Sequence, residues 1–263
     1  MNSMIFFPAQ YPDGDWQMIA NLSAQLAGHP RFEDCTLTAS DGVKLHGWYC
    51  SPSSPTSGAP RPVLLWFHGN AGNITHRYSS ILKWVGRGLD VLIIDYRGYG
   101  RSEGKPDEAG LYRDAQAAWD FVIHDKSVAE QRVVIFGRSL GGAVAIDLAW
   151  RPSVKPAGLI IESSFTSVPD MVRHMIAIMP RLLVRTKMDS LSKITGVTVP
   201  KLFIHSRADE IIPYDQGRRL YDAAGEPKQF YTLDTAGHNE TEMVGGEPYF
   251  NTLHTFITAQ LSS

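Results

Sequence analysis

From residue 63 to its end, the chain alternates between short apolar runs and longer helix-compatible stretches. The apolar runs are rich in Val, Ile and Leu and occupy residues 63–67, 91–95, 133–136, 158–161, 202–205 and 229–233. The helix-compatible stretches are residues 74–86, 107–124, 140–150, 168–179, 214–223 and 247–261. Unbroken apolar strands separated by helices are typical of a parallel sheet covered on both faces. The sequence therefore predicts an α/β fold with a mostly parallel sheet.

Two further strands are predicted before this alternation, at residues 33–39 and 43–50. They flank Asp41-Gly42, a turn signal, and predict an antiparallel hairpin at the edge of the sheet. In this register Cys50 lies opposite Glu33 rather than Cys35, so no disulfide is expected. Residues 51–62 are rich in Pro, Ser and Gly and predict an exposed loop within the domain. We expect residues 1–30 to form an extension packed on a single domain that covers 31–263.

The composition excludes several classes of protein. The 263 residues are 43% hydrophobic with a net charge of -2, which favours one globular domain with a sizeable core. No basic run suggests a nucleic-acid or anionic-membrane partner. No apolar run approaches the ~20 residues that span a bilayer, and the first eight residues lack the pattern of a signal peptide. A cytoplasmic location is therefore expected.

A G-x-S-x-G pattern at residues 137–141 lies between the apolar run 133–136 and the helix-compatible stretch 140–150. This context predicts a nucleophile elbow, in which Ser139 stands at the tip of a sharp strand-to-helix turn. Glycines two positions to either side leave room for the turn to close. The start of the helix would aim main-chain N–H groups and a partial positive charge at a developing oxyanion.

A serine nucleophile needs a base, and the base needs an acid that orients it. Among nine histidines, His238 is the predicted base because it follows the last apolar run and a glycine, in a loop. Asp209 is the predicted acid because it ends the preceding run and precedes Pro213. Its neighbour Glu210 competes with it, and Glu162, at the end of an earlier run, is an alternative acid. The chain order Ser, Asp, His is typical of α/β hydrolases.

The oxyanion would need two main-chain donors. The N–H of Leu140 is the first, and Asn70, in the loop 68–73, is the predicted second donor. His68 is expected to brace that loop. The glycine- and arginine-rich loop 95–102 lacks the Lys-Ser/Thr of a P-loop, and we assign it a structural role.

Five motifs together are more specific than the elbow alone. They are His-Gly-Asn-Ala-Gly-Asn at 68–73, Asp-Tyr-Arg-Gly-Tyr-Gly-Arg-Ser at 95–102, Gly-Arg-Ser-Leu-Gly-Gly at 137–142, Glu-Ser-Ser-Phe-Thr-Ser at 162–167 and Gly-His-Asn at 237–239. From Ile5 onward the chain resembles the α/β-hydrolase superfamily, in its cap-poor branch of bud-emergence-type hydrolases, which includes protein depalmitoylases and bacterial esterases. The resemblance implies acyl hydrolysis by Ser139, Asp209 and His238 with no cofactor. Relatives often carry a membrane anchor before the Phe-Phe-Pro segment, where this sequence has five residues.

The expected substrate is a small-molecule or acylated ester or thioester, with no metal involved. The stretch 163–191 is apolar and rich in methionine, which suits acyl chains of short to medium length, although simple packing on the sheet explains it equally well. An aminopeptidase or amidase with the same three residues is the alternative reaction. A non-catalytic binding protein on a hydrolase scaffold is the alternative class.

Overall fold

The computed structural model describes residues 5–17, 19, 30–53, 61–175 and 186–261. Its backbone divides into two compact units, Met1–Val133 and Val134–Ser263, which we describe separately. The predicted boundary between residues 30 and 31 stays a prediction. Within the described ranges, no helix has both the length and the apolar character needed to cross a membrane.

The first unit contains a sheet in the order β4-β6-β3-β2. These strands are β2 (Arg31–Thr38), β3 (Lys44–Ser51), β4 (Val63–Phe67) and β6 (Asp90–Ile94). The pair β4/β6 is parallel, whereas β3 is antiparallel to both β2 and β6. The helical segments are η2 (Ile74–Arg77), α2 (Tyr78–Val85), α3 (Glu108–Asp120), η3 (Phe121–Asp125) and η4 (Glu130–Arg132).

The predicted hairpin forms, but its register is one residue from the expected one. Cys50 pairs with Phe32 instead of Glu33, and both cysteines are free. The difference arises at the turn, where Gly42 N donates to Ala39 O at 2.8 Å and Gly42 has φ 84°. A turn of three residues, closed by a glycine in the left-handed region, is a standard hairpin connection. It centres the pairing on Asp41, whereas the prediction centred it between Asp41 and Gly42.

A segment before the hairpin is tied to the loop that follows β4. There β1 (Phe7–Pro8) pairs in parallel with β5 (Ala71–Gly72). The side chain of Asn70 accepts from Phe7 N and Tyr99 Oη and donates to Ile5 O. This loop is therefore held by the start of the chain as well as by its own strand.

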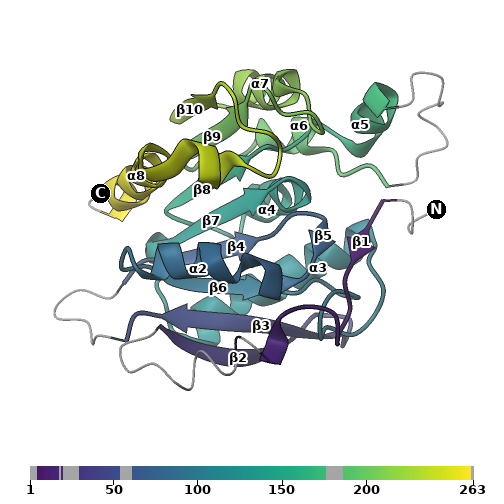
Figure 1. Ribbon diagram of the computed structural model, residues 1–263, viewed down its shortest axis with the longest axis vertical. Coiled ribbons are helices and arrows are strands. Elements are labelled where there is room, and N and C mark those ends of the chain that lie inside the picture. Colours follow the sequence, from purple (N-terminus) through teal and green to yellow (C-terminus); the bar gives the residue numbers. More distant parts are fainter. Residues whose placement is uncertain (1–4, 18, 20–29, 54–60, 176–185, 262–263) are drawn as a thin grey trace. The chain divides into compact units, whose positions relative to one another are not determined.

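The second unit carries four parallel strands in the order β10-β9-β8-β7 (Figure 1). Their bounds are β7 (Val133–Arg138, which begins at the unit boundary), β8 (Gly158–Glu162), β9 (Lys201–Ser206) and β10 (Lys228–Leu233). All residues of β8 and β9 are buried, as expected for strands covered on both faces. Because the strands are parallel, their carboxyl ends lie at one edge, where ligands bind in such sheets.

Five helices connect and follow these strands in the described part of the unit. They are α4 (Leu140–Trp150), α5 (Val168–Met175), α6 (Ser190–Ile194), α7 (Tyr214–Ala223) and α8 (Thr241–Leu261). The last helix starts six residues before the predicted one, and it is broken at Gly246, where φ is 51°. Gly246 and Pro248 are helix-breaking residues, so the sequence pattern revealed only the part after the break.

Candidate active site

Ser139 lies at the turn between β7 and α4, as the elbow predicts. Its φ of 55° and ψ of -118° are strained for a residue with a side chain. A Cβ on Gly137 would overlap the carbonyl of Gly141, and a Cβ on Gly142 would lie 2.5 Å from Ser164. The serine backbone is fixed from the end of β8 and the residues after it, because Ser139 N donates to Glu162 O at 2.9 Å and Ser164 Oγ donates to Ser139 O at 2.9 Å. The glycines thus permit the turn, and β8 holds it.

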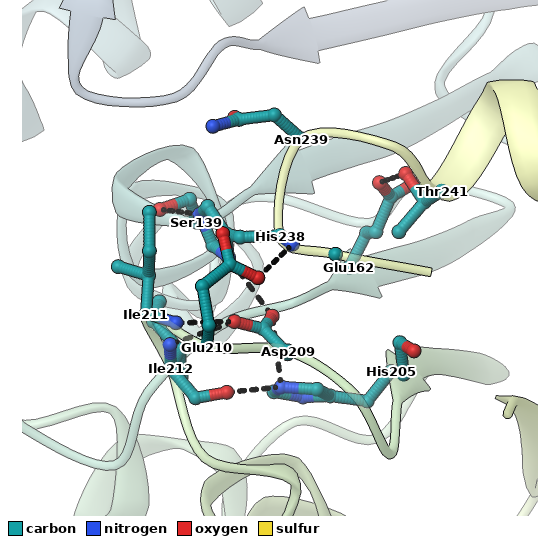
Figure 2. Close-up of polar contacts among 12 residues, drawn as sticks. Ser139, Glu162, His205, Asp209, Glu210, Ile211, Ile212, His238, Asn239 and Thr241 are labelled. Atoms are coloured by element: carbon teal, nitrogen blue, oxygen red, sulfur yellow. Dashed lines mark hydrogen bonds and ion pairs between the residues drawn. The ribbon is translucent and has the colours of Figure 1, made fainter. Parts of the chain in front are cut away.

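His238 reaches Ser139 from the loop between β10 and α8. Its Nε2 lies 3.1 Å from Ser139 Oγ, and its Nδ1 lies 2.8 Å from Asp209 Oδ2. The side chain of His238 is 7% exposed and that of Asp209 is fully buried, and Figure 2 shows the contact between them. Three residues widely separated in sequence therefore form one hydrogen-bonded chain with the geometry of a Ser-His-Asp arrangement.

Asp209 is oriented by several donors in the loop after β9. Its Oδ1 accepts from the main-chain N–H groups of Ile211 at 3.0 Å and Ile212 at 2.8 Å, leaving Oδ2 for the imidazole (Figure 2). Burial by itself would raise the pKa of this carboxyl. The contacts with His205 and His238 outweigh burial and hold the pKa of Asp209 below its usual range. The carboxylate is thus ionised and directed at Nδ1.

Glu210 competes with Asp209 in the sequence but contacts a different part of His238. Its Oε2 accepts from the main-chain N–H of His238 at 2.9 Å (Figure 2). That hydrogen bond is the main reason why the pKa of Glu210 is lowered. Glu210 is exposed, whereas Asp209 is 8% exposed. The neighbouring carboxylates therefore divide two tasks, with Asp209 on the ring and Glu210 on the backbone.

The alternative acid, Glu162, is buried and bonded elsewhere. Its carboxylate accepts from Thr241 Oγ1 at 2.6 Å and Tyr249 Oη at 2.5 Å, and Arg138 Nε lies 3.0 Å from its Oε1. These partners leave it no contact with the imidazole among the described residues.

Two residues near the site escaped the sequence reasoning. His205 Nε2 lies 2.9 Å from Ile212 O and 3.4 Å from Asp209 Oδ2. His205, which lies below Asp209 in Figure 2, therefore supports the loop that carries Asp209. Arg138 donates to His238 O and Asn239 Oδ1. In the sequence, the only signal of a role for Arg138 was its position directly before Ser139 in the G-x-S-x-G pattern. In the structure, β7 and β8 pair Arg138 with Glu162.

The other predicted residues lie as follows. Leu140 is the first residue of α4, where a helix leaves its main-chain N–H groups without intrahelical partners. Asn70 lies in the first unit, after β4. His68 is fully buried, its Nδ1 lies 2.7 Å from Gly69 O, and burial lowers the pKa of its imidazole to about 4. In the loop 95–102, Arg97 is bound to Asp114 and Asp41, as expected for a structural role.

Residues 176–185, which form part of the apolar, methionine-rich stretch 163–191, lie outside the described residues. In the ranges that the structure does describe, His, Cys, Asp and Glu side chains form no group of three that could hold a metal ion.

Comparison with known proteins places the chain in a family. Residues 58–195 match the family model described as Hydrolase_4, serine aminopeptidase S33. Protein bem46 of Schizosaccharomyces pombe is 32% identical over 262 residues, which cover 96% of this chain and 84% of bem46. The α/β hydrolase domain-containing protein WAV2 of Arabidopsis thaliana is 34% identical over 244 residues, which cover 86% of this chain and 78% of WAV2.

Among solved structures, an esterase of Pyrococcus furiosus superposes with a TM-score of 0.75 at 19% identity, over 97% of this chain and 98% of the esterase. This likeness concerns the fold, which is the α/β-hydrolase fold. With the sequence relatives, it leads to one conclusion: the chain belongs to the α/β-hydrolase family, in the branch that includes protein bem46 and WAV2.

Proposed function

We propose that this hydrolase cleaves carboxylic esters or thioesters of short to medium acyl chains through an acyl-enzyme on Ser139. The observation that carries the proposal is the continuous contact from Ser139 Oγ through the imidazole of His238 to Asp209, at 3.1 and 2.8 Å. A serine hydroxyl becomes an effective nucleophile when a positioned base removes its proton. The hydrogen-bond distances to His238 and Asp209 are those that this proton transfer needs.

In the first half-reaction, Ser139 Oγ attacks the carbonyl carbon while His238 Nε2 takes the hydroxyl proton. The tetrahedral intermediate collapses, the bond to the alcohol or thiol breaks, and His238 returns the proton to that leaving group. In the second half-reaction, water attacks the acyl-enzyme with His238 again as base, and the carboxylic acid leaves. Asp209 stays ionised throughout and holds the imidazole in the tautomer with its proton on Nδ1.

The negative charge on the carbonyl oxygen needs donors that are in place before the reaction. The N–H of Leu140, at the start of α4, is the first proposed donor. The main chain at Asn70 is the second. The side-chain amide of Asn70 is hydrogen-bonded to Phe7 N and Ile5 O. Only the main chain of Asn70 therefore takes part in this proposal.

The first test uses a fluorophosphonate probe and p-nitrophenyl esters from acetate to laurate. The wild-type protein is expected to be labelled at Ser139, as located by mass spectrometry, and to prefer the shorter esters. Ser139→Ala is expected to lose labelling and at least about 10⁴-fold in kcat. Equal hydrolysis by Ser139→Ala would refute the mechanism, and an unlabelled wild type would favour a non-catalytic binding protein.

Amide cleavage is the second candidate, because the matching family model is described as a serine aminopeptidase. The same three residues serve both reactions, but an amine must be protonated as it leaves. An aminoacyl coumarin amide, a p-nitrophenyl ester and an acyl thioester assayed side by side separate the possibilities. We expect the highest kcat/KM with an ester or thioester. The P. furiosus esterase, at 19% identity, supports this preference only by analogy of fold.

A further inference from the structure

Glu162 is a fully buried carboxyl group beside the proposed site that the mechanism does not use. Burying a charge is costly unless it is paired and hydrogen-bonded. Its donors are the hydroxyls of Thr241 and Tyr249, and its ionic partner is Arg138 at 3.0 Å. Figure 2 shows the bond to Thr241, immediately after the loop of His238. The carboxylate thus gathers groups from β7 and α8 at the end of β8.

The break in α8 makes this gathering possible. Thr241 and Tyr249 are eight residues apart, which in a continuous helix separates them by about 12 Å along the axis. That separation of the backbone positions works against both hydroxyls meeting one carboxylate. The non-helical backbone at Gly246 brings them together, at 2.6 and 2.5 Å. The start of α8, and with it the end of the His238 loop, is therefore anchored on Glu162.

Arg138 extends this anchor to His238 itself. While its Nε lies next to Glu162, its Nη2 donates to the main-chain carbonyl of His238 and to Asn239 Oδ1 at 3.2 Å. Glu210 holds the main-chain N–H of the same histidine at 2.9 Å. Both polar groups of the His238 backbone are thus bound by side chains, although the residue lies in a loop.

From this arrangement we propose that Arg138, braced by Glu162, is a positioning residue that fixes the backbone of His238 and so the approach of Nε2 to Ser139. The inference rests on the proposed function of Ser139 and His238. Arg138 occupies the variable position of the G-x-S-x-G pattern, directly before the nucleophile. One side chain therefore couples the elbow to the loop that carries the base. A guanidinium suits this task because its charge is spread over the whole planar group, so that Nη2 can hydrogen-bond the loop while Nε lies at ion-pair distance from Glu162.

The test compares Arg138→Met, which keeps the length of the side chain, with Arg138→Lys and a matched control. The control is Arg151→Met, which removes another arginine of the same unit that is ion-paired at 2.7 Å, with Asp147 on α4. Turnover of p-nitrophenyl butyrate is measured per active site titrated with a fluorophosphonate, so that loss of folded protein does not count. Hydrogen–deuterium exchange without substrate follows the peptide over residues 235–241.

Arg138→Met is expected to lower kcat per titrated site about 10- to 100-fold with KM within about twofold, because small misplacements of reacting groups cost about that much. Arg138→Lys is expected to recover part of this loss, since an ammonium reaches one of the two acceptors. Deuterium uptake over 235–241 should rise in Arg138→Met and stay at the wild-type level in Arg151→Met.

The inference is overturned if Arg138→Met turns over within twofold of wild type per titrated site, or if its uptake over 235–241 is unchanged. Full activity of Ser139→Ala would instead refute the proposed function. In that case the exchange measurement still decides whether Arg138 holds the His238 backbone, because it requires no catalysis.

Discussion

Two buried carboxylates at the ends of neighbouring strands serve the same histidine in different ways. Asp209, after β9, contacts the imidazole of His238 directly, and Glu162, at the end of β8, contacts Arg138, which donates to the carbonyl of His238. Asp209 has its second oxygen occupied by main-chain N–H groups. Glu162 has its oxygens occupied by side-chain hydroxyls.

The difference teaches that burial and position do not identify the acid of such a site. Both carboxylates are buried and both follow apolar runs. What distinguishes them is the partner of each carboxylate: one oxygen of Asp209 contacts the imidazole of His238, whereas Glu162 contacts Arg138. Asp209 can set the tautomer of the imidazole, whereas Glu162 can set only where the backbone of His238 lies. Asp209 thus acts on proton transfer, whereas Glu162 acts on the distance between His238 Nε2 and Ser139 Oγ.

Among the variants that compare the two carboxylates, Asp209→Asn is expected to have the largest effect. The amide would favour the wrong tautomer of His238, and a change of this kind costs roughly 10⁴-fold in kcat in serine proteases. We expect a loss of about 10³- to 10⁴-fold, measured with p-nitrophenyl butyrate per titrated site. Asp234→Asn, which changes an exposed carboxylate of the next loop, is the control and should stay near the wild-type rate. A loss below tenfold in Asp209→Asn would assign the acid elsewhere.

A smaller loss of activity and a clearer loss of stability are expected from Glu162→Gln. The amide keeps the shape but removes the charge that pairs with Arg138, and breaking one half of a buried pair costs roughly 3–5 kcal/mol in the free energy of unfolding. Because Arg138 is 15% exposed, we expect about 2–4 kcal/mol in urea denaturation. The expected fall in kcat is about 5- to 20-fold. A fall in kcat as large as that of Asp209→Asn would mean that Glu162 acts on the imidazole of His238 itself, and the proposed difference between the two carboxylates would be wrong.

The pH dependence of stability should also separate Asp209 from its asparagine variant. The folded pKa of Asp209 is below its usual range, so its ionisation stabilises the fold fully above the unfolded pKa of about 3.9. This contribution is lost as the pH falls through the folded pKa. Urea denaturation at pH 5, 4 and 3 should therefore show the wild type losing free energy of unfolding faster than Asp209→Asn. Parallel losses would mean that Asp209 is not preferentially ionised in the fold.

The smallest effect is expected from Tyr249→Phe, which removes one donor from Glu162 and leaves Arg138 and Thr241 in place. Burial first, and the Glu162 carboxylate next, raise the pKa of Tyr249 far above its usual value, so the hydroxyl keeps its proton and donates. We expect a loss of about 1–2 kcal/mol in the free energy of unfolding and a kcat within about threefold of wild type. A tenfold fall in kcat, measured per titrated site, would show that Tyr249 does more than hold the carboxylate.

Much of this site was predictable because its parts lie at strand ends. Ser139, Asp209 and His238 each follow an apolar run, and parallel strands bring their carboxyl ends to one edge. The strand at 63–67 was predicted to the residue. The start of α8 at Thr241 was not predicted. Gly246 and Pro248 are helix-breaking residues, and they interrupt the helical pattern between Thr241 and the predicted start at residue 247.

By itself, the sequence determined the α/β alternation, the strand-to-helix turn at Ser139 and the order of the proposed nucleophile, acid and base, since these depend on apolar periodicity and on glycines at close approaches. The sequence favoured Asp209 and left Glu162 as an alternative; only the tertiary structure decided which carboxylate meets the ring and which one meets Arg138. That choice depends on the register of β7 against β8 and on the break in α8. Both are set by packing between distant segments, and no local pattern of residues records them.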